Sequence, residues 1–137
     1  MTKIVYRDGY EYQLVEDYTV PTGVRPGVSV SNRFIRLDFD GTLTIRADYA
    51  WDGPSGPAID TKNFMRGSLV HDALYQLMRE GYLDPDQWRD PADRELQRIC
   101  LQDGMSSMRA WWVYQGVRLG GGPAADPKRA RKPTRAP

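Results

Sequence analysis

The stretch that decides the fold, and any chemistry, is Ser68-Leu69-Val70-His71-Asp72-Ala73-Leu74-Tyr75-Gln76. It contains the only histidine among the 137 residues, and an aspartate follows that histidine directly. On a helix with about 3.6 residues per turn, His71 and Tyr75 share a face, and Asp72 is rotated from His71 by about 100°. Histidine is the side chain that gains and loses a proton near neutral pH. Any acid–base chemistry in this chain is therefore expected at this stretch.

Three helices are predicted, over residues 63–80, 90–104 and 106–119. The first contains the histidine and ends at Gly81, because glycine commonly follows the last helical residue. In the second, Asp90 is the expected N-cap and Pro91 the first helical residue. The third is expected to begin at Ser106 or Ser107.

The half of the chain before these helices has the alternating pattern of strands. Residues 35–39 and 43–49 alternate apolar with polar side chains, and Asp40-Gly41 between them favours a tight hairpin turn. Phe39 is expected on the apolar face of this hairpin. Residues 10–14 indicate another strand. We predict an α+β fold over residues 1–119, with an N-terminal antiparallel sheet packed against about three C-terminal helices.

Composition limits the class of protein. The chain has a mass of 15.6 kDa, 40% hydrophobic residues and a net charge of +1. A single cysteine rules out an internal disulfide and a zinc site of paired cysteines. The N-terminus lacks the apolar run of a signal peptide, and no segment has the roughly 20 apolar residues of a membrane span. A soluble protein that is not secreted by a signal peptide is expected.

The last residues, 120–137, form a basic tail rich in glycine, proline and alanine. Its charged residues are Lys128, Arg129, Arg131, Lys132, Arg135 and one acid, Asp126. Such a segment has too few apolar side chains for a core, so a disordered or extended tail is expected. It is either a solvated end or an electrostatic arm for nucleic acid, acidic lipid or a protein partner.

Candidate site residues come from three segments. Asp93 shares a stripe of the second predicted helix with apolar residues, so its carboxylate is expected to point toward the first helix. A histidine held by such an aspartate is an oriented general base. Asp72, together with carbonyl groups of the glycine- and proline-rich segment 49–57, offers the oxygen ligands that calcium prefers.

The alternative interpretation is structural. His71 and Asp93 then form a hydrogen-bonded pair without chemistry, and Asp93, near the predicted helix start, complements the helix dipole. Tyr75, Trp111 and Trp112 then serve packing or an interface.

Several of these motifs resemble a domain family of unsettled activity that is widespread in tailed bacteriophages and prophages. Its loop motif matches residues 52–57, its histidine–aspartate–x–leucine–tyrosine helix matches residues 71–75, and its alanine–aspartate pair matches residues 92–93. Its closing aromatic–x–x–valine–arginine motif matches residues 114–118. The resemblance implies a phage or prophage protein, located in the host cytoplasm or in the virion.

The same motifs resemble, more weakly, phospholipase A2, above all the parvoviral type without disulfides. The resemblance implies that His71 activates water, that Asp93 orients His71 and that Tyr75 supports Asp93. It also implies a calcium ion bound by Asp72 and by loop carbonyl groups, namely those of Trp51, Gly53 and Ser55. In this chain Ser55 replaces a loop glycine, and two prolines stiffen the loop.

Two hypotheses from different classes follow. The first is a phage accessory protein with a calcium-dependent, phospholipase-A2-like site for ester hydrolysis, whose partner is a membrane phospholipid. The second is a non-enzymatic virion component or host-factor-binding protein, in which the histidine–aspartate cluster is structural. Nucleic-acid binding depends on the basic tail alone.

Overall fold

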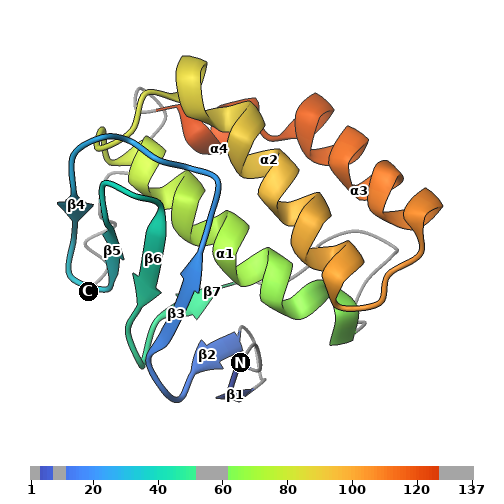
Figure 1. Cartoon of the computed structure of the whole chain (residues 1–137), viewed down its shortest axis with the longest axis horizontal. Coiled ribbons are helices and arrows are strands. Elements are labelled where there is room, and N and C mark those ends of the chain that lie inside the picture. Colours follow the sequence, from blue (N-terminus) through green and yellow to red (C-terminus); the bar gives the residue numbers. More distant parts are fainter. Residues whose placement is uncertain (1–3, 8–11, 52–61, 127–137) are drawn as a thin grey trace, which may run out of the picture.

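The computed structural model describes residues 4–7, 12–51 and 62–126. In these ranges the strands come first: β1 (Tyr6–Arg7), β2 (Tyr12–Leu14), β3 (Tyr18–Pro21), β4 (Val30–Ser31), β5 (Ile35–Leu37), β6 (Thr42–Ile45) and β7 (Ala50–Trp51). The helices follow: α1 (Lys62–Arg79), α2 (Pro85–Gln102), α3 (Ser107–Gly120) and the short α4 (Gly122–Ala125). The predicted α+β fold, with antiparallel strands before helices, is confirmed (Figure 1).

The strands form two small antiparallel sheets rather than one. Their strand orders are β1-β2-β7 and β3-β6-β5-β4. The predicted hairpin is β5–β6, in which Ile35 lies opposite Ile45 and Leu37 lies opposite Leu43. All four side chains are buried, so the alternation did identify the face of this hairpin that covers the core.

The turn between β5 and β6 depends on a glycine. Gly41 has a φ of 94°, and a Cβ atom there would lie 2.4 Å from the carbonyl oxygen of Thr22. Only glycine fits such a position.

The same turn explains one wrong prediction. Phe39 was expected on the apolar face of the hairpin but is 62% exposed. Strand β5 ends at Leu37, so Phe39 belongs to the turn, where side chains no longer alternate between faces.

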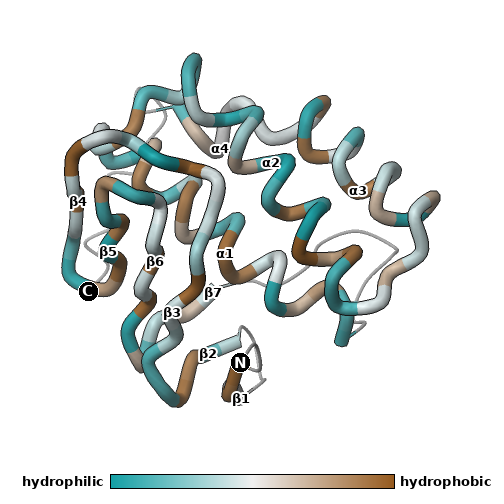
Figure 2. Tube along the Cα trace, viewed as in Figure 1, coloured by the Kyte–Doolittle hydropathy of each residue, from teal (hydrophilic) through white to brown (hydrophobic). Residues whose placement is uncertain are grey.

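Helix α1 is the central element of the molecule. Of its 18 residues, 13 are buried, so the helix is covered on nearly all sides. The strands lie on one side of it, and α2, α3 and α4 lie on the other (Figure 1). Hydrophobic residues recur along α1, whereas much of α2 is hydrophilic (Figure 2). The chain turns after α1 at Gly81, which has a φ of 85°, as predicted.

Helix α2 begins earlier than predicted. Its N-cap is Asp84, whose side chain accepts a hydrogen bond from the backbone N–H of Asp86, and Pro85 is the first helical residue. The pair Asp90-Pro91 has the same signature, but it lies inside the helix. Asp93 is therefore far from the helix start and fully buried, and the predicted role of Asp93 in complementing the helix dipole is wrong.

The C-terminal segments complete the fold. Ser106 caps α3 by accepting a hydrogen bond from the backbone N–H of Arg109, at the predicted start. Residues 122–125, which were assigned to the tail, form the short helix α4, in which Ala125 is fully buried. The five basic tail residues lie outside the described ranges. None of the described helices combines the length and the apolar character needed to cross a membrane.

Candidate functional site: a buried histidine–aspartate pair

Helices α1 and α2 approach each other closely at the turn before His71. A Cβ atom on Gly67 would lie 2.9 Å from Cδ1 of Leu96 and 3.0 Å from Sγ of Cys100. These distances are shorter than normal contacts, so a larger residue here would displace Leu96 or Cys100 from its packed position. One turn further along α1, the close approach brings His71 within hydrogen-bonding distance of α2.

The centre of the site is the carboxylate of Asp93, which is 0% exposed. Its Oδ1 lies 2.6 Å from Nε2 of His71 and accepts a hydrogen bond of 2.6 Å from the hydroxyl of Tyr75. Its Oδ2 accepts a hydrogen bond of 3.0 Å from Nη1 of Arg118 on α3. A buried carboxylate is costly unless it is paired and hydrogen-bonded, and here three donors and one positive charge compensate that cost.

The ring of His71 is oriented by two neighbours. Because a carboxylate only accepts hydrogen bonds, the Nε2 atom facing Asp93 carries a proton in the neutral ring, and Nδ1 is then the bare nitrogen. Nδ1 has no hydrogen-bond partner among the described residues. The ring of Tyr75 stacks against the imidazole, with centroids 4.1 Å apart. The side chain keeps about 10% of its surface exposed. The arrangement fixes the ring and leaves one nitrogen able to accept a proton.

Tyr75 is held as firmly as the histidine. Burial raises the pKa of Tyr75 well above its usual range, and the hydrogen bond to Asp93 raises it further. Its hydroxyl also accepts a hydrogen bond of 3.3 Å from Nε of Arg89. The backbone at Gly121 passes so close that a Cβ atom there would lie 2.8 Å from this hydroxyl. Tyr75 therefore stays protonated and acts as a fixed donor to Asp93.

A second layer of polar contacts surrounds Arg118. Nε of Arg118 lies 3.6 Å from Oδ1 of Asp90, and Tyr114 donates a hydrogen bond to the same carboxylate. That bond, followed by the bond from Arg94, lowers the pKa of Asp90. Arg89 donates to the backbone carbonyl of Arg118. These contacts fix the end of α3 against α2.

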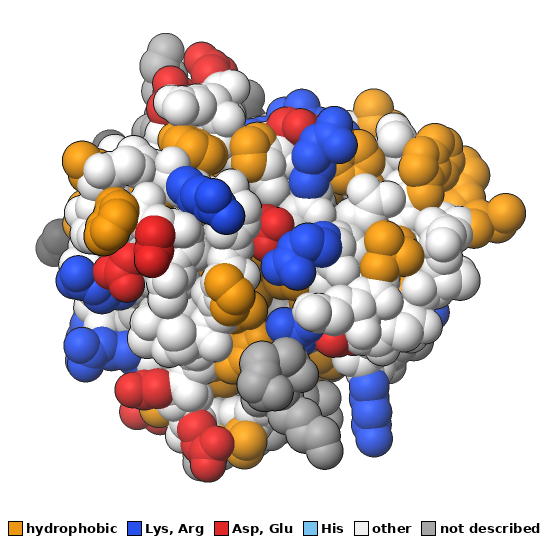
Figure 3. Space-filling model, viewed as in Figure 1, with side chains coloured by type: hydrophobic (Ala, Val, Ile, Leu, Met, Phe, Trp, Pro, Cys, Tyr) orange, Lys and Arg blue, Asp and Glu red, His pale blue; other side chains and the backbone are white. Residues whose placement is uncertain are grey.

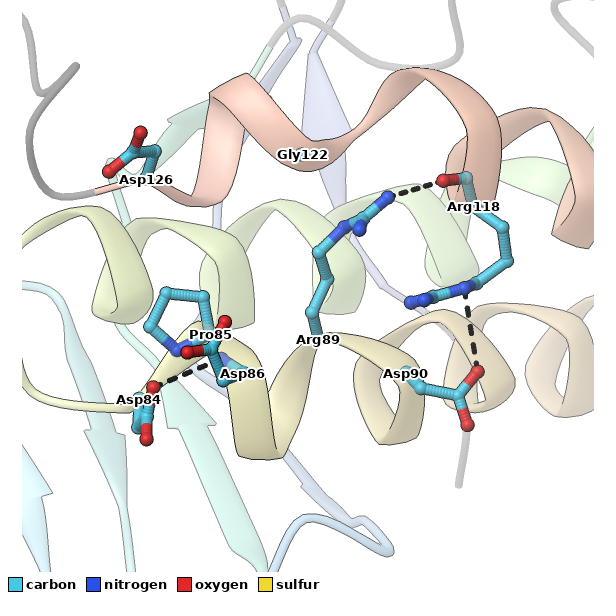
Figure 4. Close-up of a pocket in the computed structure, with 8 residues that line it drawn as sticks. All are labelled: Asp84, Pro85, Asp86, Arg89, Asp90, Arg118, Gly122 and Asp126. Carbon is cyan, nitrogen blue, oxygen red and sulfur yellow. Dashed lines mark hydrogen bonds and ion pairs between the residues drawn. The ribbon is translucent and has the colours of Figure 1, made fainter.

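A polar pocket of about 630 Å³ lies beside this second layer (Figure 4). The residues that line it are Asp84, Pro85, Asp86, Arg89, Asp90, Arg118, Gly122 and Asp126. Arg118 lines the pocket and also bonds to Asp93, but neither Asp93 nor His71 lines it. This pocket is not the space next to the histidine that the enzyme hypothesis needs.

The predicted calcium ligands are only partly described. Asp72 lies on α1 and is partly buried, and Trp51 is buried, with its indole N–H donating a 3.0 Å hydrogen bond to Oγ of Ser68. This bond holds the end of β7 against α1, one turn before His71. Gly53 and Ser55 lie outside the described residues. Within the described ranges, no three His, Cys, Asp or Glu side chains gather into a metal site, so calcium would depend on Asp72 with backbone carbonyls.

Sequence reasoning placed His71, Tyr75 and Asp93 on facing sides of two helices, and the structure brings all three together. It missed Arg89 and Asp90 as members of the network and gave Arg118 no role. The only signal for Arg118 was its place in the closing motif of residues 114–118. Comparison of the chain with family models, with curated proteins and with solved structures gave no match in any of the three.

Proposed function

We propose that this protein hydrolyses an ester bond, with His71 as the general base and Asp93 as its positioning residue. The observation that supports the proposal is the 2.6 Å contact between Nε2 of His71 and the buried carboxylate of Asp93. It leaves Nδ1 as the basic nitrogen of an imidazole whose orientation is fixed. An oriented imidazole next to a carboxylate is the arrangement that activates water or a hydroxyl nucleophile.

The proposed reaction uses the two nitrogens differently. Nδ1 of His71 takes a proton from a water molecule, and the oxygen of that water forms a bond to the acyl carbon. The bond from the acyl carbon to the alcohol oxygen then breaks, and the imidazolium returns its proton to that oxygen. Asp93 stabilises the imidazolium through Nε2 in the meantime. Arg118 also forms an ion pair with Asp93. This pairing keeps the carboxylate in place, but it also limits how strongly Asp93 stabilises the imidazolium.

The substrate class, a phospholipid, and the setting, a bacteriophage accessory protein, come from the resemblances of residues 52–57, 71–75, 92–93 and 114–118. The same source adds calcium at Asp72, with the carbonyl groups of Trp51, Gly53 and Ser55. A bound calcium ion would supply positive charge for the developing oxyanion. Asp72 is suited to it, because a carboxylate is the ligand type that calcium prefers.

The second candidate is a non-enzymatic phage protein, in the virion or bound to a host factor. The pairing of the buried atoms favours it: in the described ranges, every side-chain nitrogen or oxygen that is fully closed to solvent has a hydrogen-bond partner. His71 itself is only 8% exposed. Under this alternative, the four side chains His71, Tyr75, Asp93 and Arg118 lock three helices together, and the protein contacts its partner elsewhere.

Hydrolysis assays with phospholipid and short-chain ester substrates separate the two candidates. Removing a general base lowers the rate by about 10²- to 10⁴-fold, which is the loss expected for His71→Ala. Asp93→Asn should also lower the rate, whereas Asp86→Asn, on the same helix but outside the network, should retain it. Unfolding curves of each variant show whether the fold persists. If folded wild-type protein hydrolyses none of these esters with or without calcium, or His71→Ala retains full activity, the hydrolase proposal fails.

A further inference from the structure

The outer face of α3 exposes large hydrophobic side chains along the whole helix. Their exposed fractions are 73% for Met108, 48% for Trp111, 62% for Trp112 and 88% for Leu119. At about 100° per residue these positions fall within a stripe roughly 100° wide. Ala110, Val113 and Val117 on the opposite side pack against α2. Figure 3 shows hydrophobic side chains protruding over α3, at the edge of the molecule that faces away from the strands.

We infer that this face, which we call the α3 ridge (Met108, Trp111, Trp112 and Leu119), binds the surface of an anionic phospholipid bilayer. Tryptophan is favoured at membrane–water interfaces, where its apolar ring and N–H group meet both environments. A helix with tryptophan, leucine and methionine on one face can lie in that interface without crossing the membrane. The ridge therefore has the side chains that a lipid surface selects.

The distribution of charge along the chain indicates what kind of lipid surface the α3 ridge binds. The segment that follows α4 contains five basic residues between 128 and 135, and Asp126 is the one acid after residue 103. Each lysine or arginine held near an anionic membrane surface adds to the attraction. Residues 1–119, in contrast, carry 14 basic and 17 acidic residues, a net charge of about −3. An apolar ridge followed in the chain by a basic segment supplies the two signals that stable attachment to a membrane needs.

A second copy of the chain is less suited than a bilayer to cover the α3 ridge. Stable dimer interfaces use about 20–30 residues from each partner, whereas the ridge is one helix wide with four large apolar side chains. It also protrudes instead of forming a flat surface (Figure 3). The same helix supplies Arg118 to the network around Asp93, so a bilayer docked on α3 would lie near the proposed site. The lipid-binding proposal does not depend on that site being catalytic.

The test measures how the full-length protein partitions onto vesicles of phosphatidylcholine with about 30% phosphatidylglycerol. Sedimentation gives the bound fraction, and a blue shift of tryptophan fluorescence reports burial. The double variant Trp112→Ser/Leu119→Ser should bind the vesicles at least about tenfold more weakly than the wild type. It removes two large apolar side chains from the face that the bilayer would bury. Phe39→Ser is the matched control, since Phe39 is as exposed as Trp112, at 62%, but lies in the β5–β6 turn. It should bind like the wild type.

A second experiment tests the contribution of the basic residues to vesicle binding. Replacing the five basic residues after residue 127 with glutamine should weaken binding to the anionic vesicles about tenfold or more, and added salt should have the same effect on the wild type. The proposal is overturned if the wild type binds no anionic vesicles, or if Phe39→Ser loses as much binding as the ridge variant. It is also overturned if light scattering shows a dimer that Trp112→Ser dissociates. His71→Ala should bind vesicles normally, so failure of the hydrolase proposal and failure of this one are distinguishable.

Discussion

His71 and Tyr75, one turn apart on α1, bond to the same oxygen atom, Oδ1 of Asp93, each at 2.6 Å. Their rings also lie against each other, with centroids 4.1 Å apart. The i, i+4 spacing of the two residues makes this geometry available on any helix, but Asp93 must come from a neighbouring helix to use it. The shared oxygen couples the orientation of the imidazole to the position of the tyrosine hydroxyl.

Removing the tyrosine hydroxyl tests that coupling. Tyr75→Phe deletes a buried donor to Asp93 and should lower the free energy of unfolding by about 1–2 kcal/mol. Tyr82→Phe, at an exposed position, should change it by less than about 0.5 kcal/mol. Urea unfolding of both variants measures the difference. Equal effects of the two substitutions would show that the bond from Tyr75 to Asp93 contributes nothing to stability.

The close approach of α1 and α2 gives a second prediction. Gly67→Ala inserts a methyl group against Leu96, which is 1% exposed and has little room to move, and overpacking of this kind costs about 1–3 kcal/mol. Gly116→Ala on α3 meets no atom within 4 Å and should instead stabilise the helix by up to about 1 kcal/mol. Thermal unfolding should therefore shift in opposite directions. A stabilised Gly67→Ala variant would contradict the described packing.

Stability should fall at alkaline pH. Burial raises the pKa of Cys100 to about 12, and burial also raises the pKa of Tyr75. The unfolded chain releases these protons at lower pH than the folded chain, so this contribution is complete below about pH 9 and is lost as pH rises toward 12. The slope for one group reaches about 1.4 kcal/mol per pH unit. Cys100→Ala should flatten the pH dependence of unfolding above pH 9, and an unchanged slope would contradict it.

Calcium binding is a fourth prediction. Calorimetric titration of the wild type should show calcium binding, and Asp72→Asn should abolish it, because the substitution removes the carboxylate of the proposed site. Asp86→Asn, which removes a carboxylate from the polar pocket, should leave the titration unchanged. Absence of binding at millimolar calcium would remove calcium from the proposal and leave the histidine–aspartate pair to be tested by itself.

The elements that were predicted correctly have local signals. Asp40-Gly41 marks the hairpin turn, Gly81 the end of α1 and Ser106 the start of α3. The start of α2 was misplaced because Asp84-Pro85 and Asp90-Pro91 have the same local signature. Packing decides between the two pairs: the first turns of α2 carry Trp88, which packs against the core, and this start also positions Arg89 next to Tyr75.

The site was predictable only in part, for a related reason. His71 and Tyr75 are one helical turn apart, and Asp93 lies on the apolar stripe of its helix, so pattern alone suggested that they meet. Arg118 lies in the last turn of α3, where a basic residue is common because it complements the helix dipole. Its bond to Asp93 depends on how α3 packs against α2, and no local pattern encodes that packing.

The central claim is that His71 is a base whose Nδ1 can be reached from solvent. Because the chain has one histidine, diethyl pyrocarbonate modification measured by absorbance reports on His71 alone. If the claim is correct, His71 in the folded protein reacts at neutral pH within about tenfold of the rate of an exposed histidine, and the adduct forms at Nδ1. In the contrary case, His71 reacts only after unfolding, at a rate that follows the population of the unfolded state. That result would show that His71 is a buried structural residue and would contradict the hydrolase proposal.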